Sequence, residues 1–233
     1  MKILHLLKSG TFSGAENIAL MLMDLFCEDE TIYASPEGSI REFVTQRNHQ
    51  YYPLKNTNIS EVKKVIKELK PDIVHAHDFS MATNAALAFT NTPIIAHLHN
   101  NPPWLKSINS KSVGFALALP FIKQVISVSK SIEDEYCFKS LLKGKNTIVG
   151  NIVNLNYVQK QAKAFKVDKR FDLIFLGRLT EPKNPMAFCS IVNEIRNTKD
   201  SSIQAVMVGD GDLRVDIEEY VKKNNLENNI SLV

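Results

Sequence analysis

The feature that most constrains this chain is a regular alternation of short, largely apolar runs with stretches of helical periodicity. Residues 3–7 and 173–176 are apolar runs of strand length, whereas residues 61–69 place apolar side chains at every third or fourth position. Strands that are apolar throughout are typical of parallel sheets with helices on both faces. The sequence therefore predicts an α/β protein built from repeated β-α-β units.

The same patterns locate the individual elements. Ser60 is the expected N-cap of helix 61–69, and residues 154–170 form a connection of mixed charge between two blocks. The second block stops at a predicted strand, so we expect a chain that is cut short within its second domain. The expected strands are 3–7, 31–34, 73–76, 93–97, 125–128, 147–149, 173–176, 205–208 and 230–233, and the expected helices are 15–26, 61–69, 81–89, 131–142, 185–196 and 213–223.

Charge and cysteine content exclude several classes of protein. The chain has 28 Lys and Arg against 25 Asp and Glu, a net charge of +3, which is too balanced for a protein that binds nucleic acid by electrostatics. Its three cysteines form no C-x-x-C pair, which is typical of reduced thiols in the cytoplasm. No apolar run approaches the length of about 20 residues that a membrane span needs. We expect a soluble, cytoplasmic protein.

The loop after the first predicted strand contains two glycines, Gly10 and Gly14, and leads into a helix. In open α/β sheets, ligands bind outside the carboxyl ends of strands, and helix N-termini favour anions. Gly14 would let a phosphate or sugar approach the backbone N–H groups. The alternative is that the two glycines merely turn the chain, and the dinucleotide fingerprint G-x-G-x-x-G is absent.

Two H-x-H strings follow two predicted strands. The spacing places His97 and His99 on the same side of an extended segment, followed by Asn100. The other string holds His75 and His77. Imidazoles at strand ends suit hydrogen bonds to a substrate hydroxyl, acid–base chemistry or metal binding. The two strings fit a metal site and a substrate site equally well.

The second block offers a pair of cations around a turn. Arg178 and Lys183 lie in G-R-L-T-E-P-K-N, directly after a strand, where they could clamp a diphosphate. The alternative is an exposed turn with two solvated charges. Asp210 and Asp212 form a D-x-D string that can hold a metal, but we expect Asp212 to cap the helix that begins at Leu213.

Taken together and in this order, these strings resemble those of retaining GT-B glycosyltransferases of the family-four type, the glycosyl transferases group 1. The resemblance covers essentially the whole chain and is closest to bacterial enzymes of cell-surface polysaccharide synthesis. Its carriers are S-G-A-E at 13–16, P-D-I-V-H-A-H at 71–77, H-L-H-N at 97–100, G-R-L-T-E-P-K-N-P at 177–185, V-G-D-G-D-L-R at 208–214 and L-E-N-N-I-S-L-V at 226–233.

The resemblance implies a GT-B-like α/β fold. A complete Rossmann-like domain for the acceptor (1–168) would face the first half of a second one (169–233) that binds a nucleotide sugar. The implied reaction is transfer of a hexose, with retention, from a nucleotide diphosphate sugar to a glycan or lipid-linked acceptor, with neither metal nor other cofactor. The implied residues are His99 at the reacting sugar, Gly14, Arg178 and Lys183 at the donor phosphates, and His97, Asn100 and His77 on the acceptor or sugar side.

One departure concerns the family's E-x7-E segment, which would lie beyond Val233 and is absent from this chain. We therefore expect this chain to be inactive by itself and to self-associate through the uncovered flank of its second sheet. An alternative is a catalytically inactive module that binds a glycan or a partner protein. A sugar-nucleotide epimerase is disfavoured, because its carboxylate-rich strings are missing.

The segment 104–123 has the pattern of a helix that could contact a membrane surface. Residues 113–122 are nearly all apolar, and Lys106, Lys111 and Lys123 surround them. Such a helix can lie at a lipid surface and receive a lipid-linked acceptor, which would make the protein peripheral at the inner face of the membrane. The alternative, which the pattern favours, is a buried helix between two strands.

Overall fold

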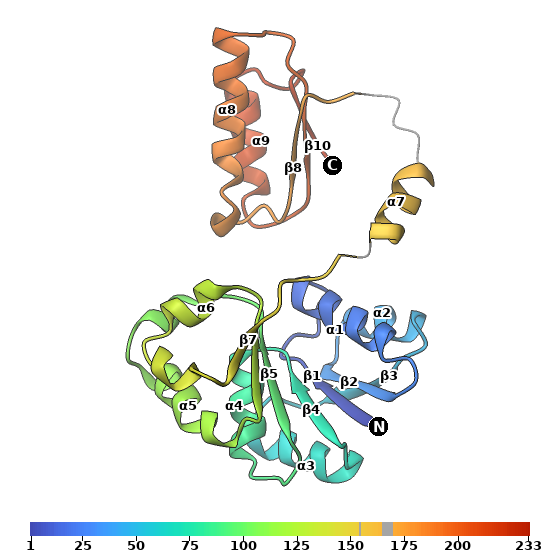
Figure 1. Cartoon of the computed structure of the whole chain (residues 1–233). Helices are drawn as coiled ribbons and strands as arrows, with labels where there is room; N and C mark the ends of the chain where they lie inside the picture. The colour runs from blue at the N-terminus through green and yellow to red at the C-terminus, as the bar shows by residue number, and fades with distance from the viewer. Residues whose placement is uncertain (154, 165–169) are drawn as a thin grey trace. The chain divides into compact units, whose positions relative to one another are not determined.

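The computed structural model describes residues 1–153, 155–164 and 170–233. It divides into two compact units, Met1–Val153 and Asn154–Val233, which are described separately below (Figure 1). The domain boundary expected between residues 168 and 169 lies outside the described residues.

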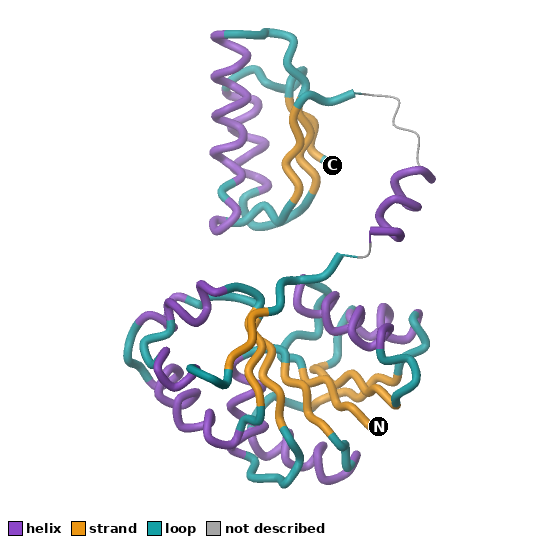
Figure 2. The backbone as a smooth tube through the Cα atoms, in the orientation of Figure 1, coloured by secondary structure: helices purple, strands orange, loops and turns teal. Residues whose placement is uncertain are grey.

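The first unit is built on one parallel sheet of seven strands (Figure 2). Their order is β3-β2-β1-β4-β5-β6-β7, and every pair is parallel. The order reverses between β1 and β4, and this switch point is where open α/β sheets bind ligands. The strands are β1 Lys2–Leu6, β2 Glu30–Pro36, β3 Gln50–Leu54, β4 Ile73–Ala76, β5 Ile94–Leu98, β6 Gln124–Ser127 and β7 Asn146–Ile148.

Helices cover both faces of this sheet, and each face has its own apolar core. One core joins α1 and α2 to Leu7 and Tyr33, whereas the other joins α3, α4 and α5 to Leu4 and Val74. The α/β class with helices on both faces, predicted from the apolar strands, is confirmed. The helices are α1 Gly14–Leu25, α2 Ile40–Gln46, α3 Ile59–Leu69, α4 Phe79–Leu87, α5 Ser110–Ala118 and α6 Lys130–Glu135, with 3-10 turns η1 Pro103–Lys106, η2 Leu119–Phe121 and η3 Lys139–Leu142.

The second unit is a three-stranded parallel sheet of order β10-β9-β8, with β8 Leu173–Leu176, β9 Ala205–Val208 and β10 Ile230–Leu232. The helices α8 Pro185–Thr198 and α9 Arg214–Lys223 pack on one face of it (Figure 1). On β8, Ile174 and Leu176 alternate with residues of that core and are 64% and 78% exposed. Self-association through this exposed flank stays a prediction.

Several expected boundaries were wrong. Asn58, not Ser60, caps α3, because its side chain accepts a hydrogen bond from the Glu61 N–H. Asp212 does not cap α9, whose N-cap is Leu213 without a side-chain hydrogen bond. Asp78 caps α4, which therefore begins at Phe79 rather than at Met81.

Two expected segments have a different structure. Helix 131–142 divides into α6 and η3, because Tyr136 adopts an extended backbone and its hydroxyl donates to the Ser112 carbonyl at 2.8 Å. The stretch 154–170, expected to be a connection, contains helix α7 Leu155–Ala164 and otherwise lies partly outside the described residues.

The segment 104–123 is neither a long surface helix nor fully buried. It forms η1, α5 and η2, with Phe115 and Leu119 in the core and Leu117 and Phe121 more than half exposed. Within the described parts of the chain, no helix is long and apolar enough to cross a membrane.

Candidate functional site

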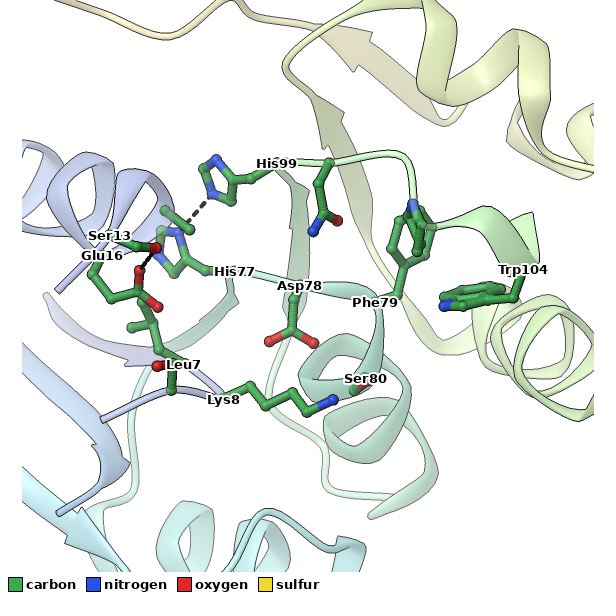
Figure 3. A pocket seen from close by; sticks show the side chains of 14 residues that line it. Leu7, Lys8, Ser13, Glu16, His77, Asp78, Phe79, Ser80, His99 and Trp104 are labelled. Atoms are coloured by element: carbon green, nitrogen blue, oxygen red, sulfur yellow. Dashed lines mark hydrogen bonds between the residues drawn. The ribbon is translucent and has the colours of Figure 1, made fainter. Parts of the chain in front are cut away.

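A pocket of about 490 Å³ opens at the switch point of the first sheet. Its lining comes from the loops after β1 and β4, the segment after β5 and the first turn of α1 (Figure 3). Because the carboxyl ends of parallel strands lie on one edge, residues distant in sequence meet here. Four of the predicted residues, His77, His99, Asn100 and Gly14, lie at or next to this pocket: the first three line it, and Gly14 lies between its lining residues Ser13 and Ala15.

His77 and His99 share a hydrogen bond at one side of the pocket. The Nδ1 atom of His77 lies 3.2 Å from the Nε2 atom of His99, as the dashed line in Figure 3 shows. His77 is 2% exposed, whereas His99 is half-buried. His99 therefore presents its ring to the pocket, and His77 supports it from behind.

Three further histidines continue this pair into the sheet. His97 lies beside His99 with ring centroids 4.1 Å apart, which confirms that the two share one side of the strand. The Nδ1 atom of His97 lies 3.2 Å from Nε2 of His75, and Nδ1 of His5 lies 3.0 Å from Nε2 of His77. The signal for His5 was one polar residue inside the apolar run 3–7, and sequence reasoning gave it no role. His75 was considered only as a member of one H-x-H string.

Burial keeps these imidazoles neutral at physiological pH. It lowers the pKa of His5, His75 and His97 to about 3 and that of His99 to about 4, and it holds the pKa of His77 well below its usual range. A neutral imidazole offers one donor and one acceptor. The Nε2 atom of His99 already faces His77 and its Nδ1 atom is buried, so a ligand hydroxyl could bond to this ring only by reaching Nδ1, and the ring is a poor proton donor at pH 7.

Polar groups that sequence reasoning did not assign also line the pocket, and Figure 3 shows Ser13 and Glu16 beside His77. Glu16 is 5% exposed and accepts a short hydrogen bond from the Ser13 hydroxyl, while the Lys8 and Asp78 side chains lie close by (Figure 3). Burial raises the pKa of Asp78, and its backbone hydrogen bonds as the cap of α4 oppose that shift. The motif S-G-A-E contained the signal for Glu16.

An aromatic wall borders the pocket beyond Asn100. The rings of Phe79 and Trp104 meet edge to face with centroids 5.1 Å apart, and both residues line the pocket (Figure 3). Apolar ring faces beside polar side chains suit a ligand that has both C–H and O–H surfaces, as a sugar has.

The two glycines of the first loop have different roles. A Cβ at Gly10 would lie 2.6 Å from the Pro36 carbonyl oxygen, so this position is fixed by close backbone approach. A Cβ at Gly14 would meet nothing within 4 Å. Gly14 begins α1 and leaves free space next to the pocket, which is the space a bound phosphate would need.

The predicted cation pair lies in the second unit. Arg178 and Lys183 are exposed on the turn that leads from β8 through η4 Glu181–Lys183, and within the described residues neither makes an ion pair. Gly209 holds the neighbouring loop against this turn, because a Cβ there would lie 2.0 Å from the Gly177 carbonyl oxygen. Two cations free of partners on a supported turn can bind an anion.

Comparison with known proteins now identifies the family. The pattern of Glycosyltransferase Family 4 matches residues 24–157, more than half of the chain. The chain belongs to Glycosyltransferase Family 4. The family assignment confirms the resemblance found in the sequence, at the level of the glycosyltransferase family and its fold.

Two curated relatives of this family member are glycosyltransferases. An uncharacterized glycosyltransferase of Methanocaldococcus jannaschii is 27% identical over 200 residues, which cover 74% of this chain and 48% of the relative. A Campylobacter jejuni enzyme, an α-1,4-N-acetyl-D-galactosaminyltransferase named for an undecaprenol-linked diphosphate glycan, is 22% identical over 95% of this chain and 65% of its own length. The chain thus spans about half to two thirds of these relatives.

Solved structures show the same fold. Anabaena HepE in complex with UDP superposes with a TM-score of 0.79 at 17% identity and covers 100% of this chain and 69% of that one. UDP-N-acetylglucosamine 2-epimerase from Rickettsia bellii gives a TM-score of 0.64 at 13% identity, with 100% and 68% covered. The fold therefore accommodates more than one reaction, and the site residues must distinguish them.

Proposed function

We propose that this protein transfers a hexose from a nucleotide diphosphate sugar to a glycan or lipid-linked acceptor, with retention at the anomeric carbon. The observation that carries the proposal is the pocket at the switch point, where neutral His99 faces the open space and His77 holds it from behind at 3.2 Å. Membership of Glycosyltransferase Family 4 supports the reaction class, and the complex of HepE with UDP supports a uridine diphosphate donor.

In this proposal the first unit holds the reacting sugar. His99 exchanges a hydrogen bond with a sugar hydroxyl, and Asn100 and His77 lie within the same lining to fix its orientation. His97 contributes indirectly, because it is 5% exposed and packs against His99. Catalysis of this kind consists of positioning and charge stabilisation, which neutral, preorganised groups supply without a change of protonation.

The negative charge of the leaving diphosphate is stabilised by hydrogen-bond donors and by cations. The N–H groups at the start of α1, next to Gly14, are one source, and the exposed pair Arg178 and Lys183 in the second unit is the other. We propose that each of these two groups can bind phosphate oxygens directly, without a metal ion between protein and phosphate. Arg178 stabilises the charge that grows as the bond to the sugar breaks.

For the acceptor we propose a glycan on a lipid carrier, in the synthesis of bacterial cell-surface polysaccharide. The undecaprenol-linked substrate in the name of the Campylobacter jejuni relative supports this class. The exposed apolar side chains Ile108, Leu117 and Phe121, with Lys111 and Lys123 near them in sequence, support contact with an anionic membrane surface from the cytoplasm.

Donor binding can be tested on the protein by saturation-transfer NMR with UDP-glucose and UDP-N-acetylgalactosamine. We expect saturation of the sugar protons in wild type and a clear loss of it in His99→Ala, with nucleotide signals retained. Saturation of neither donor, in protein shown to be folded by circular dichroism, would contradict the proposal and favour the inactive glycan- or partner-binding module.

A further inference from the structure

The pocket at the switch point has a side to which the proposed reaction assigns no role. Its volume of about 490 Å³ lies within the range of about 300–1,000 Å³ that holds drug-sized ligands, which are larger than a monosaccharide. The reacting sugar is placed at His99, whereas Phe79, Trp104, Ser80 and Lys8 line the same pocket without a function. The pocket therefore has both the space and the lining for a second sugar.

Trp104 is held in a fixed orientation at the pocket wall. It lies in η1, directly after Pro102 and Pro103, and its carbonyl oxygen accepts a hydrogen bond from Nδ2 of Asn109 at 2.8 Å. Phe79 is 4% exposed and packs edge to face against the indole, with ring centroids 5.1 Å apart. Trp104 itself is half-buried, which leaves part of its side chain open to the pocket. The indole is thus a preorganised aromatic surface.

Polar groups beside this wall are open to a ligand. The indole N–H of Trp104, the ammonium group of Lys8 and the hydroxyl of Ser80 make no hydrogen bond or ion pair with any residue that the structure describes. Figure 3 shows the end of the Lys8 side chain directed toward Ser80, which lies in the first turn of α4. Such donors can bind ligand hydroxyls without breaking a hydrogen bond inside the protein.

We propose, as an extension that rests on the proposed function, that the wall of Trp104 and Phe79 is the subsite for the acceptor, and that the acceptor ends in a pyranose ring. A pyranose carries C–H groups on its ring faces and hydroxyls around its rim. The indole attracts a C–H face by dispersion and through its negatively charged ring face, while Lys8 and Ser80 bind rim hydroxyls. An open-chain polyol has the hydroxyls but no such face, so Trp104 selects a glycan.

The aromatic wall lies away from the groups proposed for the donor. Figure 3 shows Ser13, which directly precedes Gly14, on the side of His77 and His99, whereas Trp104 lies at the other end of the lining. A donor whose diphosphate binds at the start of α1 therefore has its sugar near His99. The end of the pocket at Trp104 is left for the sugar that receives the transferred residue.

Fluorescence tests the subsite directly, because Trp104 is the only tryptophan of the chain. Wild-type protein is titrated with the methyl glycosides of glucose, galactose and N-acetylgalactosamine, and with sorbitol, which has the hydroxyls but no ring. We expect a saturable change in emission with at least one glycoside and no saturable change with sorbitol. A saturable change with sorbitol, or none with any glycoside, would overturn the inference.

Saturation-transfer NMR with the same glycosides compares variants that lack the fluorescent side chain. Trp104→Leu should weaken glycoside binding by about three- to tenfold, and Trp104→Phe, which keeps an aromatic face, should weaken it less. The matched control is Phe26→Leu, because Phe26 is 44% exposed at the C-terminal end of α1, outside the pocket lining. Equal glycoside affinities of wild type and Trp104→Leu would overturn the inference.

Calorimetry with UDP-glucose separates the acceptor subsite from the proposed function. Its Kd should be the same for wild type and Trp104→Leu, because the donor is not bound by the aromatic wall. If Trp104→Leu weakens UDP-glucose as much as the glycosides, the indole holds the donor and the inference is overturned. If UDP-glucose binds and no glycoside does, the acceptor subsite is wrong and the sugar-transfer proposal stands. Wild-type protein that binds glycosides at Trp104 but no nucleotide would support the subsite and contradict the proposed function.

Discussion

The Nδ1 atom of His77 and the Nε2 atom of His99 lie 3.2 Å apart, although the two histidines are 22 positions apart in the sequence. They meet because β4 and β5 are parallel neighbours whose carboxyl ends reach the same edge of the sheet. The pair marks the side of the pocket where the fold places neutral imidazole against open space.

Replacement of His99 by alanine should separate function from stability. Because the ring is half-buried at a pocket wall, its loss removes a contact to the sugar but leaves little core unfilled. In a form of the enzyme that includes a complete second domain, we expect turnover to fall by at least about tenfold, with the melting temperature nearly unchanged. Calorimetry and a nucleotide-release assay measure the two. A large drop in melting temperature with normal turnover per folded molecule would show His99 to be structural.

Acid should unfold the first unit at an unusually high pH. In the folded state the pKa of His5, His75 and His97 is about 3, whereas an unfolded histidine titrates near 6.5. Below pH 6.5 the unfolded chain therefore binds more protons, so stability is present above that pH and is lost as pH falls. Each buried histidine contributes up to about 1.4 kcal/mol per pH unit within this window.

Urea unfolding in the presence of a chelator measures this effect. The urea midpoint of the first unit should drop clearly between about pH 7.5 and about pH 5. Equal midpoints at both pH values would mean that the imidazoles are already protonated in the folded protein.

Removal of the Arg178 guanidinium should weaken nucleotide diphosphate binding. A hydrogen bond to a charged group is worth roughly 1.5–3 kcal/mol, so we expect Arg178→Ala to raise the Kd at least about tenfold. Lys222→Ala, an exposed cation at the far end of α9, is the control and should have no effect. Titration calorimetry with UDP measures the two affinities. Equal affinities of wild type and Arg178→Ala would refute the proposal that Arg178 binds the diphosphate.

Contact with a membrane should depend on the exposed apolar side chains of the 104–123 segment. Leu117 is 64% exposed and Phe121 52% exposed. We expect the protein to float with liposomes that contain anionic lipid at low salt, and Leu117→Glu to reduce flotation severalfold. Neutral liposomes are the control. If the wild-type protein stays at the bottom of the gradient with anionic lipid, the proposed membrane contact is wrong.

The sequence was sufficient to place several strands of both units, including β8, whose Ile174 and Leu176 are exposed. The bounds of β4, β8 and β9 agree with the expected ones, because continuous apolar runs between turn residues leave little choice. It was insufficient for α2 and β3. In α2 only Ile40 and Val44 are buried, and Pro53 interrupts the strand pattern of β3. Helix starts were also misplaced, because several Ser, Asn and Asp side chains compete as caps.

The candidate site was predictable where a motif sits at a strand end, as with His77, His99 and Asn100. The depth of the histidine cluster was not, because it depends on register. His5 is paired with His75 across β1 and β4, and nothing in either local sequence specifies that pairing. The proposed function of Arg178 and Lys183 likewise rests on their charge and on their position on the turn after β8.

Proton NMR of the transfer product tests the central proposal most directly. The protein is incubated with a nucleotide diphosphate sugar and an acceptor glycan, and the coupling of the new anomeric proton is compared with that of the donor. We predict that any transfer product has the same anomeric configuration as the donor and is formed at least about tenfold more slowly by His99→Ala. A product of inverted configuration would contradict the account.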